Sequence, residues 1–179
     1  MLQLLLFDAN IDLYLESEVK NMSIERVREY MKEFGRENDI LEFEVSSATV
    51  ALAAQALGTE PGRIAKTLSF KKDDGCILVV TAGDVKIDNS KYKHKFGLKA
   101  KMLTAEEAVE LIGHAVGGVC PFAVNDGVIG IYIDESVKKF ETVYPACGSS
   151  NSAIQLTPDE LFTLSKATEW VDVTKPIEA

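Results

Sequence analysis

Two glycines, a cysteine and a proline occur together at residues 117–122, in the order Gly-Gly-Val-Cys-Pro-Phe. Paired glycines adopt backbone conformations closed to other residues and let a ligand approach main-chain N–H groups closely. Such a loop can direct backbone donors at a carbonyl oxygen, as oxyanion holes do. Taken alone, the six residues are more typical of a tight turn after a helix.

Lys66 is the only charged residue in the β-like run Ile64–Phe70. The alternation of a strand places Ile64, Lys66 and Leu68 on one face. An ammonium on an inward face needs a partner or a function. On an exposed edge, the same lysine would reach solvent along its aliphatic stem.

Cys120 is a candidate nucleophile, but no histidine is fixed beside it in the sequence. His114 lies six residues earlier and reaches the thiol only in a particular fold. A free cysteine is more often a small buried hydrophobe. His114 also follows Gly113, where it can cap the last carbonyls of a preceding helix.

A second glycine-containing segment runs through Gly148-Ser-Ser-Asn-Ser152. As a polar turn it needs no further explanation. As a second wall of a pocket, it offers hydroxyl and amide donors suited to a ribose or a carbonyl.

The elements that must position these residues alternate without a regular strand–helix–strand rhythm. Apolar spacing and capping signals at Ser23, Thr49, Asp88, Thr104 and Thr157 predict helices over 24–34, 50–57, 89–96 and 105–113, and one that begins at 158. Strands are predicted over 40–45, 64–70, 77–81, 128–133, 142–144, 153–156 and 170–173. This mixture favours a single α+β domain with a mixed sheet.

The 179-residue chain carries a net charge of −9, but its charge is unevenly distributed. Between Arg63 and Lys101, ten basic residues face four acidic ones. A basic segment on an acidic body suits a docking face for a polyanion, and it also fits a solvated lysine-rich surface.

Several classes of protein are excluded by composition. Three separate cysteines and two histidines give no zinc pattern, so no metal or other cofactor is expected. The chain has no membrane-length apolar run and no secretory signal, which predicts a reducing, cytoplasmic location. Residues 1–21 are interpreted as an extension of uncertain status, because a well-patterned helix begins just after Met22.

Three segments in this order and spacing resemble the YbaK family, the aminoacyl-tRNA editing domain related to the insertion domain of bacterial prolyl-tRNA synthetase. The segments are Ile64-Ala-Lys-Thr-Leu68, Gly117-Gly-Val-Cys-Pro121 and Gly148-Ser-Ser-Asn-Ser-Ala-Ile-Gln-Leu156. The resemblance covers about residues 22–173. It implies one domain over 22–179, with a mixed, partly barrel-like sheet surrounded by helices.

The resemblance also implies an activity: metal-free hydrolysis of the ester that links a wrong amino acid to tRNA, assisted by the neighbouring ribose hydroxyl. The expected substrate is alanine or cysteine on tRNA for proline, and prolyl-tRNA synthetase is a possible partner. Lys66 matches the family's catalytic-site lysine, which holds the terminal phosphate or adenosine. Expected substrate-binding residues are Thr49, Gly117, Gly118, Val119, Cys120, Pro121, Gly148, Ser149 and Asn151.

Val119, Cys120 and Phe122 are expected to line a pocket for a small amino acid. Lys86, Lys91, Lys93 and Lys95, within a basic stretch that continues to Lys101, are expected to follow the acceptor stem of the tRNA.

The sequence departs from the family pattern at three positions. Cys120 stands where serine is frequent, Ala123 where glycine is frequent, and Ala153 where some members carry aspartate. These departures keep two alternatives open. One is a binding module of the same fold without turnover, and the other is a hydrolase that depends on the Cys120 thiol.

Overall fold

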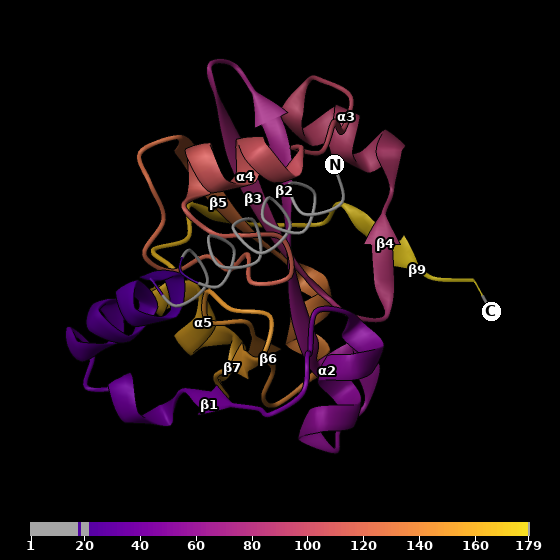
Figure 1. Cartoon of the computed structure of the whole chain (residues 1–179). Coiled ribbons are helices and arrows are strands. Elements are labelled where there is room, and N and C mark those ends of the chain that lie inside the picture. The colour runs from indigo at the N-terminus through magenta and orange to yellow at the C-terminus, as the bar shows by residue number, and fades with distance from the viewer. Residues whose placement is uncertain (1–17, 19–21, 179) are drawn as a thin grey trace, which may run out of the picture.

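A hairpin of two long strands forms the middle of the computed structural model, which describes residue 18 and residues 22–178 (Figure 1). Strand β2 (Ile64–Lys72) pairs antiparallel with β3 (Gly75–Ala82), and this confirms the predicted hairpin. Apart from residue 18, the predicted extension over 1–21 lies outside the described residues.

The hairpin is part of a mixed five-stranded sheet. The strand order is β6 (Tyr144–Pro145), β2, β3, β5 (Val128–Asp134) and β8 (Glu169–Val171), and only the β2–β3 pair is antiparallel. Two small antiparallel pairs join β1 (Leu41–Glu42) to β7 (Ser152–Ala153) and β4 (Val85–Ile87) to β9 (Thr174–Pro176). The expectation of one α+β domain, with a mixed sheet surrounded by helices, is confirmed.

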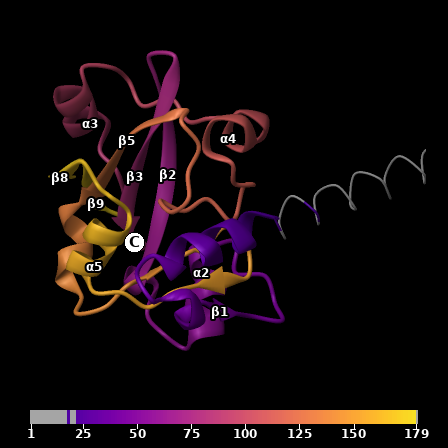
Figure 2. The same ribbon diagram turned by 90° about the vertical axis from the view of Figure 1, so that its left-hand side faces the viewer.

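Strand β3 is buried along its whole length, because helices cover both faces of the sheet. Leu78 and Val80 pack into one cluster together with α4 (Ala105–Ile112) and the helical residues 22–32. Ile77 and Val79 point the other way and pack against α3 (Asn89–Phe96). Figure 2 shows α3 and α4 on opposite sides of the β2–β3 hairpin.

The helices begin where the capping residues predict, with one exception. Thr49 accepts a hydrogen bond from the Leu52 N–H at the start of α2 (Val50–Leu57). Thr104 forms a capping box on α4, and Thr157 forms another on α5 (Pro158–Leu164). The exception is Ser23: residues 22–32 are helical, so Ser23 is buried inside the helix and does not cap it.

Several predicted strands have different bounds in the structure. The strand predicted over 142–144 is β6, which begins at Tyr144. The run 40–45 pairs only at Leu41–Glu42, because its partner β7 is itself two residues long. The run 153–156 contributes to β7 mainly at its first residue. The predicted strand 170–173 is a strand only at Trp170 and Val171, in β8, and β9 begins beyond it at Thr174. Between the two, the Asp134 carboxylate accepts hydrogen bonds from Val173 N and Thr174 Oγ1.

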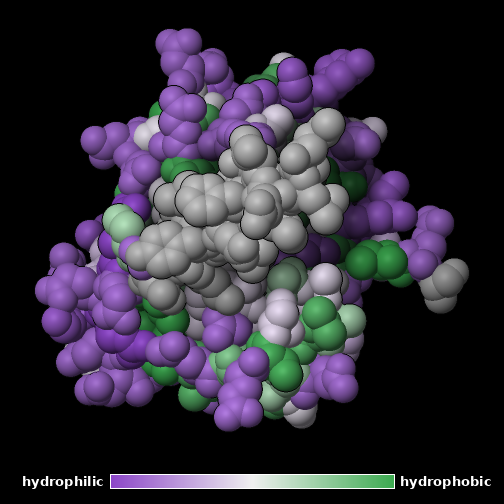
Figure 3. Space-filling view, in the orientation of Figure 1, coloured by the Kyte–Doolittle hydropathy of each residue, from purple (hydrophilic) through white to green (hydrophobic). Residues whose placement is uncertain are grey.

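The surface is hydrophilic over α3 and more apolar over α2 (Figure 3). Near α2, Leu52 and Val45 expose 43% and 61% of their surface. None of the helices in the described part of the chain is long and apolar enough to cross a membrane.

Candidate functional site

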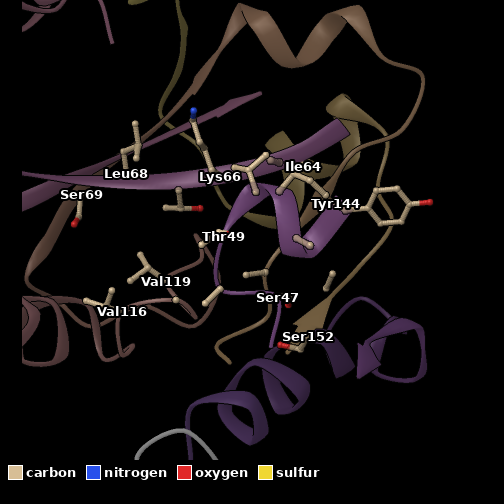
Figure 4. Close-up of a pocket in the computed structure, with 18 of the residues that line it drawn as sticks. Ser47, Thr49, Ile64, Lys66, Leu68, Ser69, Val116, Val119, Tyr144 and Ser152 are labelled. Atoms are coloured by element: carbon tan, nitrogen blue, oxygen red, sulfur yellow. The ribbon is translucent and has the colours of Figure 1, made fainter. Parts of the chain in front are cut away.

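A cavity of about 380 Å³ lies between β2, the start of α2 and the glycine loop (residues 117–121) (Figure 4). This volume is in the range of small-ligand sites. Its polar lining residues are Ser47, Thr49, Lys66, Thr67, Ser69 and Ser152. Of the residues expected to bind substrate, Thr49, Lys66, Gly117 and Val119 line this cavity.

The glycine loop and the polar turn 148–152 pack backbone against backbone. A Cβ atom placed on Gly118 would lie 2.6 Å from the carbonyl carbon and oxygen of Gly148 and 2.7 Å from Ser149 N. Gly117 has a φ of +91°, in the left-handed region that favours glycine. The structure therefore brings together two segments that are about thirty residues apart in the sequence. Their close contact is possible because residue 118 is glycine and has no side chain.

Lys66 leaves β2 on the side away from the glycine loop. Figure 4 shows Lys66 and Leu68 on one side of β2, and Ser69 and Val119 on the other. The Lys66 ammonium donates to the carbonyl oxygens of Val85 and, at 3.4 Å, Gly83. Burial lowers the pKa of Lys66, while the nearby Asp84 carboxylate opposes that shift. The ammonium is thus held at the rim of the cavity by neutral carbonyl groups.

Cys120 and Phe122 are buried in the hydrophobic core, and of the three residues expected to form the pocket only Val119 lines the cavity. Cys120 is fully buried, and burial raises the pKa of its thiol to about 12. A nucleophilic cysteine needs an accessible thiolate. The alternative of a hydrolase that uses the Cys120 thiol therefore lacks support.

Three other expected substrate-binding residues support the walls of the cavity without lining it. Asn151 Nδ2 donates to the Phe43 carbonyl at 2.8 Å, and Ser149 Oγ donates to Ser152 Oγ at 2.7 Å. Gly148 has a φ of +87° and lies directly against Ser23. A fourth, Pro121, is buried at the end of the glycine loop.

His114 is buried and connects the glycine loop to the helix over residues 22–32. Its Nε2 lies 2.8 Å from the Phe122 carbonyl and 3.5 Å from Cys120 Sγ, and its Nδ1 contacts Ser23 Oγ. This pattern fits a neutral ring that donates from Nε2 and accepts at Nδ1. Burial lowers the pKa of His114, which favours that neutral form. His114 does not serve as a simple helix cap, as its position after Gly113 had suggested.

Arg26 ties the same helix to the end of the glycine loop. Its Nη2 donates to the Ala123 carbonyl at 2.8 Å and to Asn125 Oδ1 at 2.9 Å. Ala123 has a φ of +50°, which is strained for a residue with a side chain. This conformation gives a physical reason why glycine suits this position. Sequence reasoning missed both anchors, because each joins residues more than ninety positions apart.

Thr67 is another residue to which the sequence analysis gave no role. It lines the cavity, and its Oγ1 is buried without a hydrogen-bond partner among the described residues. Buried hydroxyl groups nearly always find a partner, since leaving one unpaired costs about 1–3 kcal/mol. An unpartnered hydroxyl in a cavity marks a position where a ligand can bind.

The basic segment is only partly available to a polyanion. On α3, Lys91 pairs with Asp172 at 2.7 Å and Lys95 pairs with Glu169 at 2.6 Å. Lys86 and Lys93 have no ion pair with the described residues. The same is true of Lys101, which precedes the cavity-lining Met102. Within residues 22–178, no three His, Cys, Asp or Glu side chains group as metal ligands would.

Comparison with known proteins adds a family to this geometry. The model of the aminoacyl-tRNA editing domain matches residues 44–164, which include β2, the glycine loop and the turn 148–152. An uncharacterised Bacillus subtilis protein, YwhH, is 51% identical over 158 residues, which are 88% of this chain and all of that protein.

Two further similar proteins are described in relation to the charging of tRNA with proline. The proline–tRNA ligase of Shouchella clausii is 32% identical over 105 residues, which are 58% of this chain and 18% of the ligase. A crystal structure described provisionally as a trans-editing enzyme for prolyl-tRNA synthetase has a TM-score of 0.77 and 32% identity, over 86% of this chain and 97% of that one.

Proposed function

Because the chain belongs to the aminoacyl-tRNA editing domain family, we propose that it is a free-standing deacylase that hydrolyses mischarged aminoacyl-tRNA. The observation that carries this proposal is the cavity itself, with the backbone of the glycine loop on one side and β2 on the other. The similarity of the chain to a segment of proline–tRNA ligase supports tRNA for proline as the carrier of the amino acid. The Val119 side chain in the cavity wall supports a small amino acid, alanine or cysteine, as the one removed.

The proposed reaction is addition of water to the ester carbonyl, followed by loss of the ribose oxygen. The new C–O bond forms as the carbonyl oxygen becomes negative, and backbone N–H groups of the glycine loop stabilise that charge. The ester C–O bond then breaks, and the proton released by the water ends on the departing ribose oxygen. In this scheme the neighbouring ribose hydroxyl carries the proton, so the step uses neither a metal nor a protein base.

Lys66 is proposed to hold the terminal phosphate or adenosine of the tRNA. Its two carbonyl contacts leave at least one ammonium proton for a ligand, since lysine has three. A compact ammonium on a flexible stem suits a phosphate. Its lowered pKa places the loss of this charge at a lower pH than for an exposed lysine.

The exposed lysines on β4 and α3, Lys86 and Lys93 among them, are proposed to contact the tRNA acceptor stem. Their charge stands out on a chain with a net charge of −9, so the contact is local to this face. Prolyl-tRNA synthetase is the proposed source of the mischarged tRNA, and the cytoplasm the proposed location.

A second candidate function, tRNA binding without turnover, is favoured by one observation. Ala153 lines the cavity at a position where some family members carry a carboxylate. If that carboxylate takes part in proton transfer, its loss would leave a site that binds the substrate and does not hydrolyse it.

The two functions are separated by incubating the protein with a panel of mischarged tRNAs, including alanyl- and cysteinyl-tRNA for proline. We expect hydrolysis by the wild type, and a loss of about 10- to 150-fold in kcat/KM for Lys66→Ala, the value of one charge-assisted hydrogen bond. Lys72→Ala, at the far end of the same strand, is the matched control. Equal rates for wild type and Lys66→Ala would remove Lys66 from the mechanism, and saturable binding without any hydrolysis would favour the binding module.

A further inference from the structure

One short stretch of β2 has an open edge that faces the cavity. Along its other edge, β2 pairs with β3 over its whole length. On the cavity edge, β6 covers only Ile64 and Ala65. Farther along, Leu103 N donates to the Ser69 carbonyl at 3.3 Å, and Lys71 N donates to the Lys101 carbonyl at 2.8 Å. The edge between Ala65 and Ser69 therefore lacks a strand partner among the described residues.

The backbone N–H and C=O groups of Thr67 point away from β3, toward the cavity, along this unpaired edge. In an antiparallel pair, the N–H and C=O groups of successive residues point alternately toward the partner strand and away from it. Because Ser69 and Lys71 direct these groups away from β3, Thr67 does so too. Thr67 thus offers one N–H donor and one C=O acceptor to the cavity, next to its unpartnered Oγ1.

We propose that Thr67 binds the aminoacyl group of the substrate as a one-residue antiparallel bridge. This inference rests on the proposed function and names how the same site recognises its substrate. An aminoacyl ester carries the N–Cα–C=O unit of a peptide residue, so it can pair with a strand edge as a residue does. The Thr67 carbonyl accepts from the α-ammonium group, and the Thr67 N–H donates to the ester carbonyl.

The chemistry of the lining supports this assignment. Among the described residues, no Asp or Glu lines the cavity, so a bound α-ammonium group has only neutral oxygens to accept its protons. A buried cation needs hydrogen-bond acceptors to replace water. The free carbonyl of Thr67 is such an acceptor, and it lies beside the one free backbone donor of the same residue.

The bridge also predicts where the amino acid side chain points. Directly opposite residues of an antiparallel pair place their side chains on the same face of the sheet. The Thr67 side chain shares a face with Ser69, on the side where Figure 4 shows Val119 and opposite to Lys66. An L-amino acid therefore directs its side chain toward Val119, while a D-amino acid directs it toward Lys66.

Binding of non-hydrolysable analogues tests the bridge, whether or not the protein turns over. The probes are 3′-deoxyadenosines that carry L-alanyl, D-alanyl or propionyl groups in amide linkage at the 3′ position, measured by isothermal titration calorimetry. Propionyl lacks the α-ammonium group, so we expect its Kd to be about 10- to 150-fold weaker than that of L-alanyl. The D-alanyl analogue is also expected to bind more weakly than the L-alanyl form.

Two variants separate the backbone from the side chain. Thr67→Pro removes the N–H that β3 does not use, and proline is tolerated at such edge positions. It should weaken L-alanyl and propionyl analogues alike, by about 2- to 12-fold. Thr67→Val keeps the N–H, and with it the preference for L-alanyl over propionyl.

Equal affinity of the wild type for the L-alanyl and propionyl analogues overturns the bridge, and so does the absence of binding by either. Hydrolysis of alanyl-tRNA is measured separately. Absence of hydrolysis of alanyl-tRNA and of every other tRNA in the panel overturns the proposed deacylase, and the binding preference still decides the role of Thr67.

Discussion

Adding a single methyl group to Gly118 tests whether the backbone of the glycine loop carries the chemistry. A Cβ atom at this position lies 2.6 Å from the Gly148 carbonyl group, where ordinary contacts begin at 3.4 Å. Gly118→Ala must therefore separate the glycine loop from the turn 148–152 by about 0.8 Å, since neither backbone can rotate away as a side chain would.

The expected effect on catalysis is larger than the effect on folding. Misplacing a catalytic group by about 1 Å can reduce the rate about 100-fold, so we expect kcat/KM for alanyl-tRNA to fall by about that factor. Overpacking of this kind destabilises a protein by about 1–3 kcal/mol, which circular dichroism melting will show as a lowered Tm in a still-folded protein.

The matched control is Gly35→Ala, at the end of the helix over residues 22–32. Gly35 has a φ of +66° with open space around it, so a side chain there strains the backbone and touches nothing. We expect a stability loss of about 1 kcal/mol and an unchanged rate. Activity of a folded Gly118→Ala protein within twofold of the wild type would refute the role given to the loop backbone.

Three further predictions follow from the surroundings of the site. Burial lowers the pKa of His114 from 6.5, so the unfolded chain binds more protons below that pH. The free energy of unfolding in urea should fall as the pH drops below 6.5, and less steeply in His114→Gln than in the exposed control His94→Gln. Ala123→Gly relieves the strain at φ +50° and should raise the Tm by about 2–4 °C, whereas a lowered Tm would contradict that strain. Lys101→Ala should weaken tRNA binding and flatten its salt dependence more than Lys95→Ala, because Glu169 already neutralises Lys95; filter binding at several salt concentrations will compare them, and equal slopes would argue against this ranking.

Local signals in the sequence were sufficient for α2, α4, α5 and the central hairpin, but not for the helix over residues 22–32, where Ser23 is not the cap. Thr49, Thr104 and Thr157 cap their helices through contacts within three residues, so the information is contained in the segment itself. Short edge strands are different, because their length depends on a partner elsewhere in the chain. The two-residue pairing of β1 with β7 has no counterpart in the pattern of either segment.

The candidate site was predictable in its location and less so in its interior. The motifs around Lys66 and Gly117 indicated two walls of one cavity, and both residues line it. The direction of each side chain within the glycine loop could not be predicted, because a loop has no fixed period. The burial of Cys120 in the core was therefore not foreseen. For Thr67, the strand alternation was visible in the sequence, but the gap in its partner strands was not.

The anchors between the N-terminal helix and the glycine loop also set the order of events during synthesis. Ser23 and Arg26 leave the ribosome before their partners, which lie 91 to 99 residues later in the chain. At typical rates of about 5–20 residues per second, the helix waits about 5–20 s with its apolar side uncovered. The nascent chain is therefore exposed to aggregation and to chaperones during this interval, and the site is assembled only after the glycine loop has been synthesised.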